Sequence, residues 1–428
     1  MKIVLAHPTG NQPVRALLRA FTKARFQIEF HTTLAVNSYA AWLELLPAAI
    51  RQEWLRRAFP IPLSQIRMHP VRELARLLLP RLGLGQFVIH ETDWASVNAV
   101  YQDMDRVTAK RLSVLARRNQ VNAVYACEDG ALATFLRAKD LGLQCIYDLP
   151  IAYWETGRRL MQEEAERLPT WAATLGGGIR DSQRKLDRKN RELKLADVVV
   201  VPSQFVKDSL PAWTIGKKIV IAPFGSPGVK DKGRSELDDN KQSLDRPLRV
   251  LFAGSMGQRK GLGDLFAAIH LLNSPDIELV VMGSLLAPMA FYRNELSNFI
   301  YESGRPHEQV LTLMRSCDVF CLPSIIEGRA LVMQEAMSQG LPLIITPNTG
   351  GSDLIEEGRT GFLVPIRSPE AIAKKLIWFL ENRSEIPKMG ALAQQHSAHY
   401  TWEGYGAKIV EAITDSVQNE TQELKVRD

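Results

Sequence analysis

Short apolar runs with the composition of β-strands alternate with helix-like segments along most of the chain, and this alternation limits the possible folds. In the first half, strand-like runs occur at 2–6 (KIVLA), 120–127 (QVNAVYAC), 143–150 (LQCIYDLP) and 197–202 (DVVVVP). Helix-like runs lie between them, for example VRALLRAFTKA and DGALATFLRAKDLG. β-Branched strands separated by helices are typical of a parallel sheet covered on both faces. The sequence therefore predicts an α/β fold.

The alternation is interrupted once, by a polar stretch rich in Gly, Asp and Lys between Gly225 and Pro247. It restarts with LRVLFAG and continues to GFLVPI. Because 428 residues are too many for one ordinary domain, we expect two Rossmann-like domains with a ligand cleft between them. The expected boundaries are an N-terminal domain at 1–224, a linker at 225–247, a C-terminal domain at 248–395, and a helical tail at 396–428 that packs back on the N-terminal domain.

Composition narrows the class of protein and its compartment. The net charge of +6 favours contact with anions such as phosphates or acidic lipids. None of the four cysteines has CxxC spacing or a histidine cluster beside it, so we expect no metal or disulfide framework and a reducing cytosol. The first apolar run is too short for a signal peptide, and no apolar stretch is long enough to span a bilayer. We expect a cytoplasmic protein, at most peripheral at the inner membrane face.

A glycine-rich turn, FAGSMGQRKG, follows the first strand of the second half. Its glycines, including Gly254, allow close backbone approach, and Lys260 stands where a helix begins, which suits a phosphate. It is not a P-loop, because Arg259 occupies the position of a required glycine, and Phe266 likewise excludes a dinucleotide fingerprint. A plain strand-to-helix turn explains the glycines equally well.

Two glutamates bracket the start of a predicted helix in the segment PSIIEGRALVMQEAMSQG, which runs from Pro323 to Gly340. Glu327 belongs to the loop after a strand, the helix is expected to begin near Ala330, and Glu335 lies inside it. Gly340 is a suitable stop. Acids near a helix N-terminus gain from its dipole. From spacing alone, both side chains are as compatible with solvation as with a binding site.

Several other features favour structural roles. Asp103 and Asp105 resemble a metal-binding DxD, but a helix turns them in different directions. Four histidines, His31, His69, His90 and His307, are isolated and expected to be structural. TLGGGIRD (174–181) is expected to be a loop, with a lid as one option. Turn chemistry explains the glycines of TPNTGG (346–351).

Segment 51–86 is strongly basic, with seven arginines against two glutamates among aromatic and leucine residues. It fits an anionic membrane surface, an arginine-lined acceptor groove or a solvated helix pair. It carries no nucleic-acid recognition motif, so we expect no nucleic-acid partner.

Taken in order, five segments resemble the retaining glycosyltransferases of group 1, also called family four, which have the GT-B fold of two Rossmann-like domains. The resemblance extends from about Ala196 to Pro365 and is weaker before that. The segments are ADVVVVPSQFVKDSL, IVIAPFG, FAGSMGQRKG, PSIIEGRALVMQEAMSQGLPLIIT and GGSDLIEEGRTGFLV. The E-x7-E pattern with its flanking residues is the most specific of them.

The resemblance implies transfer of a sugar from a UDP-, GDP- or ADP-linked donor with retention at the anomeric carbon, and no metal or other cofactor. It implies that Glu327 faces the donor sugar and that Glu335 accepts hydrogen bonds from the ribose. Lys260 would neutralise the diphosphate, aided by amides near Ala330 and Leu331. The remaining implied donor-site residues are Gly10 with Asn11 beside it, Gly254, and Tyr301 near the base.

Three departures from the family pattern bear on the sugar. Ser255 stands where an arginine is frequent, so one phosphate contact is either missing or supplied by Arg259, and Ser255 itself is expected in the donor site. Arg329 and Ala330 replace the usual Phe-Gly, which would add a positive charge at the donor site. The frequent histidine of the N-terminal domain has no counterpart, and Asp148 is the nearest candidate, with Glu128 and Asp129 behind it.

These observations leave two functions from different classes. The first is a metal-independent glycosyltransferase acting on a polysaccharide, a lipid-linked sugar or a small metabolite. The second is a catalytically weakened nucleotide-sugar-binding protein with the same fold. A dehydrogenase is disfavoured, because GxGxxG and its downstream acid are missing.

Overall fold

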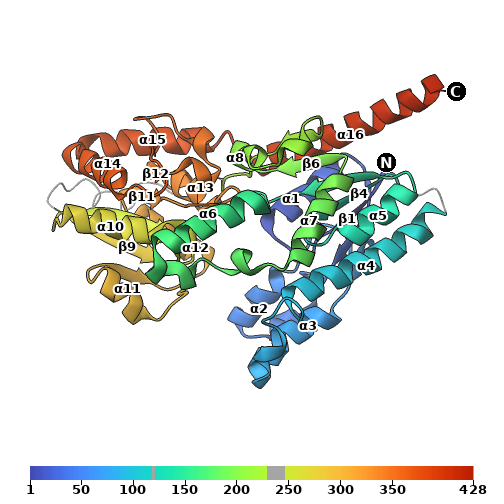
Figure 1. Ribbon diagram of the computed structural model, residues 1–428, viewed down its shortest axis with the longest axis horizontal. Coiled ribbons are helices and arrows are strands. Elements are labelled where there is room, and N and C mark those ends of the chain that lie inside the picture. Colours follow the sequence, from blue (N-terminus) through green and yellow to red (C-terminus); the bar gives the residue numbers. More distant parts are fainter. Residues whose placement is uncertain (118–120, 229–245, 428) are drawn as a thin grey trace.

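The computed structural model describes residues 1–117, 121–228 and 246–427, and contains two parallel β-sheets with helices on both faces (Figure 1). The predicted α/β class is confirmed. Most of the predicted linker, residues 229–245, lies outside the described residues, and its conformation is not considered.

Within the described residues, the N-terminal sheet has seven strands in the order β3-β2-β1-β4-β5-β6-β7, all parallel. The strands are β1 (Lys2–Ala6), β2 (Gln27–Thr32), β3 (Ile66–Met68), β4 (Ala123–Cys127), β5 (Gln144–Asp148), β6 (Val198–Val201) and β7 (Lys218–Ile221). The helices around them are α1 (Gln12–Lys23), α2 (Ala48–Leu55), α3 (Val71–Leu78), α4 (Val97–Ala116), α5 (Leu132–Asp140), α6 (Trp154–Arg167), α7 (Gln183–Leu195) and α8 (Gln204–Asp208).

The C-terminal sheet has six parallel strands in the described part of the chain, in the order β10-β9-β8-β11-β12-β13. The strands are β8 (Leu248–Ala253), β9 (Ile277–Met282), β10 (Ile300–Glu302), β11 (Val319–Leu322), β12 (Leu343–Ile345) and β13 (Gly361–Leu363). The helices are α10 (Leu262–Leu272), α11 (Met289–Glu295), α12 (His307–Arg315), α13 (Leu331–Ser338), α14 (Pro369–Glu381), α15 (Ile386–Ser397) and α16 (Trp402–Arg427).

Local sequence signals account for several element ends. Ser203 caps α8, because its hydroxyl oxygen accepts a hydrogen bond from the amide of Val206 at 3.3 Å. Gly340 follows the end of α13 with φ of +77°, a left-handed conformation that favours glycine. Both signals were read from the sequence. The short edge strands β3 and β10, with three residues each, give no comparable periodic pattern.

The chain crosses between the domains twice, and the two crossovers lie together. Ser226 donates its amide hydrogen to the carbonyl of Tyr400 at 2.8 Å. A Cβ atom at Gly225 would lie only 2.4 Å from the amide nitrogen of Trp402, so only glycine fits there. After the second crossover α16 packs on α1, where a Cβ at Gly406 would lie 2.4 Å from the Ala20 Cβ (Figure 1). The last helix thus belongs to the N-terminal half in space.

A segment of the N-terminal half also packs into the C-terminal half. The 3-10 helix η5 (Pro169–Thr174), which follows α6, places the buried Trp171 in the C-terminal core between Phe266 and Phe291. The TLGGGIRD segment that follows is held in place by a hydrogen bond from Arg158 to the carbonyl of Ile179 at 3.1 Å, and part of it forms a 3-10 helix. The sequence pattern gave no indication of this exchange between the domains.

The basic segment 51–86 is not one amphipathic helix. It comprises the end of α2, strand β3, helix α3 and three short 3-10 helices, η2 (Leu63–Gln65), η3 (Leu79–Leu82) and the start of η4 (Gly85–Phe87). Strand β3 is the edge strand of the N-terminal sheet, and α2 and α3 lie at the lower side of that domain in the view of Figure 1. Across the described residues, no helix combines the length and apolar character needed to cross a membrane.

Candidate functional site

Glu327 lies in the loop between β11 and α13, and backbone contacts fix this loop. The Glu327 amide donates to the Asn348 carbonyl at 3.0 Å, and the Asn348 side-chain amide donates to the Ile325 carbonyl at 2.8 Å. The Glu327 side chain is 11% exposed. The loop therefore presents a single, largely buried carboxylate at the carboxyl end of the sheet.

Two cations from the glycine-rich turn converge on that carboxylate. Arg259 Nη1 and Lys260 Nζ each lie 2.6 Å from Glu327 Oε1. Burial lowers the pKa of the Lys260 ammonium, partly offset by Glu327. Gly254 has φ of +154°, and the Lys260 Cε would lie 3.4 Å from a Cβ there. One carboxylate facing two cations leaves a net positive charge, so this cluster suits a further anion.

Helix α13 begins four residues after Glu327, at Leu331. The amide of Ala330 already donates to the Thr349 carbonyl at 3.3 Å. Leu331 opens the helix, whose first turn directs amide groups and the positive end of the dipole outward. Of the two residues expected to offer amides to a phosphate, Leu331 is thus the better placed.

Glu335 borders a cavity of about 400 Å³ whose lining comes from both domains. The cavity is lined by Gln12, Gly225, Pro227, His307, Leu331, Glu335 and Trp402. His307 Nδ1 lies 3.8 Å from Glu335 Oε1, and burial raises the pKa of the Glu335 carboxyl. The sequence reading treated His307 as structural and did not identify Gln12. The sequence signal that could have identified His307 is its position after a strand, because it begins α12, the element that follows β10.

Gly10 and Asn11 lie in the loop between β1 and α1, and the structure explains both by packing. A Cβ at Gly10 would lie 2.6 Å from the ring of Phe59. The Asn11 side-chain oxygen accepts the amide of Val14 at 3.0 Å and so caps α1. The Asn11 oxygen is thus engaged in helix capping, and donor binding by this residue stays a prediction.

Asp148 ends β5, and the loop after it meets the Glu327 loop across the domain boundary. A Cβ at Gly328 would lie 1.7 Å from the carbonyl oxygen of Pro150, so the two loops touch backbone to backbone. Ser203 adds a hydrogen bond from its hydroxyl to the Gly328 carbonyl at 2.6 Å. Burial raises the pKa of the Asp148 carboxyl to about 7. Asp148 and Glu327 thus stand on neighbouring loops of opposite domains.

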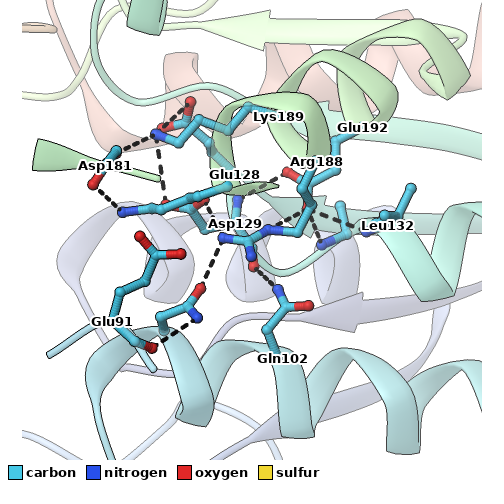
Figure 2. Close-up of polar contacts among 12 residues, drawn as sticks. Glu91, Gln102, Glu128, Asp129, Leu132, Asp181, Arg188, Lys189 and Glu192 are labelled. Atoms are coloured by element: carbon cyan, nitrogen blue, oxygen red, sulfur yellow. Dashed lines mark hydrogen bonds and ion pairs between the residues drawn. The ribbon is translucent and has the colours of Figure 1, made fainter. Parts of the chain in front are cut away.

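The turn between β4 and α5, behind Asp148, is held by side chains of α7 (Figure 2). Glu192 accepts hydrogen bonds from the amides of Asp129 at 2.9 Å and of Leu132 at 3.2 Å. Lys189 Nζ lies 3.2 Å from Glu128 Oε1, and Arg188 binds Asp129 at 2.7 Å. Asp129 keeps a left-handed φ of +70°. These internal pairs make Glu128 and Asp129 part of a fixed support rather than free ligands.

Ser255 and Tyr301 lie further from the Glu327 carboxylate. The Ser255 carbonyl accepts the amide of Gly257 at 2.8 Å within the glycine-rich turn. The Tyr301 hydroxyl donates to the Gly283 carbonyl at 3.2 Å, and Gly283 packs directly on Gly254. Ser255 therefore belongs to the loop after β8, whereas Tyr301 lies in the edge strand β10.

Arg329 makes contacts that the sequence did not indicate. Its side chain is fully buried and turns to Asp353, whose Oδ1 lies 2.7 Å from Nη1, and to the Gly350 carbonyl at 3.0 Å. Its guanidinium also lies over the ring of Tyr400. These contacts direct the Arg329 side chain to the second crossover, and a positive charge from Arg329 at the donor site stays a prediction.

The DxD pattern likewise resolves into separate contacts. Asp103 pairs with Arg72 at 3.4 Å, while Asp105 accepts the amides of Ala133 and Thr134 at 2.7 and 2.8 Å. Among the residues that the structure describes, no three carboxylate, histidine or cysteine side chains gather as a metal site requires.

Residues 234–396 match the protein family described as glycosyl transferases group 1. The chain is 30% identical over 220 residues to a D-inositol 3-phosphate glycosyltransferase of Paenarthrobacter aurescens, covering 47% of this chain and 52% of that protein. It is 26% identical over 159 residues to the amylovoran biosynthesis glycosyltransferase AmsK of Erwinia amylovora, covering 34% of this chain and 39% of that protein. The aligned part therefore spans about half or less of these curated relatives.

Solved structures show the same fold over nearly the whole chain. Sucrose-phosphate synthase from Thermosynechococcus elongatus superposes with a TM-score of 0.63 at 16% identity, covering 98% of this chain and 100% of that one. Anabaena HepE in complex with UDP and glucose gives 0.60 at 14% identity, covering 97% and 100%. The predicted GT-B fold and the resemblance to group 1 glycosyltransferases are confirmed.

The raised pKa of Asp148 gives a pH prediction. The carboxyl is neutral in the folded protein up to about pH 7 but ionises from about 3.8 when unfolded. Between these two values only the folded state keeps the proton, so stability falls progressively from about pH 3.8 to about pH 7 and levels off above pH 7. We expect the melting temperature of Asp148→Asn, relative to wild type, to increase between pH 4 and pH 7 and to change little above pH 7. Thermal denaturation across this range measures the difference, and a constant difference would contradict burial of the ionised group.

Proposed function

We propose that this chain is a retaining, metal-independent glycosyltransferase that moves a sugar from a nucleotide-sugar donor to an acceptor. The observation that carries the proposal is the cluster of Glu327 with Arg259 and Lys260, set at the junction of the two domains. The group 1 family match over residues 234–396, which include all three residues, supports the same chemistry.

In this proposal the donor diphosphate exchanges with the Glu327 carboxylate as the partner of the two cations. Lys260 and Arg259 then neutralise the charge that develops on the leaving diphosphate, aided by the dipole of α13. Glu327, released from the cations, faces the sugar and stabilises positive charge at the anomeric carbon. Fixed cations and a helix N-terminus thus take the role that a metal ion has in other transferases.

The cavity of about 400 Å³ beside Glu335 is the proposed place of the nucleoside. Its lining contributes a carboxylate, a histidine and a glutamine, which suit the hydroxyl groups of a ribose. Tyr301, in the edge strand of the C-terminal sheet, is assigned to the base of the nucleotide. Gly10 and Asp148 are assigned to the side of the donor that faces the N-terminal domain.

The donor is proposed to carry UDP, with GDP and ADP as the alternatives. Two structures that resemble this fold are HepE complexes with UDP and with UDP-glucose. The acceptor is assigned only to the class of sugar-containing or lipid-linked molecules. The alternative function, a nucleotide-sugar-binding protein with weakened catalysis, is favoured by Ser255, which offers no charge where the family frequently has arginine.

Peripheral contact with an anionic membrane is part of the proposal. Exposed apolar side chains concentrate between residues 39 and 97, where the protein also carries the arginine-rich segment 51–86. They include Tyr39, Trp42, Leu45, Ile50, Met68, Val71, Leu78, Leu82, Phe87, Ile89 and Trp94. Apolar groups beside exposed cations such as Arg56 and Arg67 suit an acidic lipid surface. This surface would hold a cytoplasmic enzyme at the inner face of the membrane.

Glu327→Gln is expected to lower kcat for sugar transfer by about 10²–10³-fold or more, since it removes the carboxylate that meets the sugar. Binding of UDP should persist or tighten, because the two cations lose their internal partner. Activity assays with a panel of UDP-, GDP- and ADP-sugars, together with calorimetry, measure both effects. Glu278→Gln is the control, because Glu278 pairs with Arg249 near the opposite end of the sheet. Full activity in Glu327→Gln would contradict the proposal.

Lys260→Ala is expected to weaken binding of nucleoside diphosphate by about 10-fold to 100-fold, the size of one or two charge-assisted contacts. Binding of the nucleoside without phosphates should change little. Titration calorimetry with UDP and with uridine compares the two. Lys388→Ala, a highly exposed lysine of the same domain, serves as the control. An equal loss for UDP and uridine would show that Lys260 does not bind phosphate.

The membrane surface is tested by Leu45→Glu combined with Leu82→Glu, at positions 86% and 71% exposed. Wild type should sediment with phosphatidylglycerol vesicles and much less with phosphatidylcholine vesicles, and the variant should bind about 10-fold more weakly. Ile215→Glu, at a position 88% exposed outside this surface, is the control. No binding of wild type, or equal weakening by the control, would overturn the assignment.

A further inference from the structure

Arg329 lies in a buried loop, two residues from the proposed catalytic group. Its side chain is fully buried, and within the part of the chain that the structure describes a single carboxylate, that of Asp353, contacts it at 2.7 Å. Its Nε donates to the Gln334 side-chain oxygen at 2.9 Å. Its guanidinium carbon lies 4.8 Å from the centre of the Tyr400 ring. Burying a charge is costly, so each of these contacts is needed to hold it.

The partners of Arg329 lead to both interdomain crossovers. Tyr400 belongs to the second crossover, and its hydroxyl also donates to the Asp353 carbonyl at 3.0 Å. Gln334 reaches the first crossover, because its amide nitrogen donates to the Phe224 carbonyl at 2.7 Å and to the Ser226 hydroxyl at 3.0 Å. Arg329 is therefore joined to one crossover directly and to the other through a single side chain.

The crossovers themselves form one unit. The amide of Ser226 donates to the Tyr400 carbonyl, and Phe224 stacks on Trp402 with ring centres 6.0 Å apart. A change in the angle between the domains would displace these two segments, because they flank the passages of the chain from one sheet to the other. The α6–η5 segment, which places Trp171 in the C-terminal core, is a further connection between the halves. A rotation there must move groups that hold Arg329 and Gln334.

On the other side, Arg329 is bound to the Glu327 loop by the main chain. Only Gly328 separates the two residues, and Gly328 is clamped between the Pro150 carbonyl, the Ser203 hydroxyl and Gly350. Gly350 in turn offers its carbonyl to Arg329. The loop that carries Glu327 and the hinge segments are thus parts of one connected set of contacts.

We propose that Arg329 is a positioning residue that couples the angle between the two domains to the placement of Glu327. The inference rests on the proposed function only in the role given to Glu327. The mechanical link itself does not depend on which ligand the cleft binds. Arg329, which departs from the family pattern, is thus assigned to the two crossovers between the domains rather than to the donor.

The link is tested first without any substrate. The native cysteines are buried, so Asp140→Cys on α5 and Lys388→Cys on α15, both largely exposed, accept spin labels on opposite domains. We expect a narrow interdomain distance distribution that becomes about twofold broader in Arg329→Met and in Tyr400→Leu. Arg293→Met is the matched control, because Arg293 likewise binds two carbonyls and stacks on a ring, Phe299, but touches neither crossover.

The outcome separates this inference from the proposed function. An unchanged distribution in both Arg329→Met and Tyr400→Leu, or equal broadening by Arg293→Met, would overturn the coupling whether or not the protein transfers a sugar. If transfer is observed, Arg329→Met should lower kcat by at least about 10-fold while the donor KM stays within about 3-fold, with partial recovery in Arg329→Lys. An equal change in kcat and KM would assign Arg329 to donor binding and contradict the positioning role.

Discussion

The contact on which the arrangement depends is the approach of Gly328 to the backbone of Pro150. A side chain at this position would collide with the opposite domain, so the Glu327 loop can lie at the junction only because glycine follows the glutamate. The Ser203 hydroxyl and Gly350 close the remaining sides of Gly328. As a result Glu327 is held by the main chains of both domains. A carboxylate so placed has little freedom to adapt, which suits a group that must meet a reacting atom in one geometry.

The electrostatics of the cleft follow from this placement. Without a ligand, Arg259 and Lys260 are balanced by Glu327 alone, and the excess positive charge, together with the α13 dipole, favours an incoming anion. The neighbouring N-terminal loops carry acids, but those of the β4–α5 turn are already neutralised by α7 (Figure 2). Burial raises the pKa of the Asp148 carboxyl to about 7 and that of the Glu192 carboxyl to about 8, so neither adds a full negative charge below about pH 7. In the proposed function, donor phosphates would therefore meet attraction from one domain without matching repulsion from the other.

The sequence predicted those features that depend on neighbours along the chain. Strand β1, the Ser203 cap and the stop at Gly340 are encoded locally, and the order of motifs identified the GT-B fold. The sequence did not predict features that depend on packing between residues far apart in the chain. Nothing near Trp171 indicates that it fills the core of the other domain, and nothing near Arg329 shows that Tyr400 lies beneath it. Asn11 is a different case, because an asparagine before Gln-Pro is a recognisable helix cap, a role that the sequence analysis did not include.

The central claim is that this cleft transfers a sugar with retention, through Glu327 and the cation pair. The most direct test is the anomeric configuration of the first product formed from an α-linked nucleotide sugar, followed by proton NMR during transfer or slow hydrolysis. The account predicts that the α-anomer appears first and that the β-anomer forms only later, by mutarotation of any free sugar. Initial release of the β-anomer would contradict it.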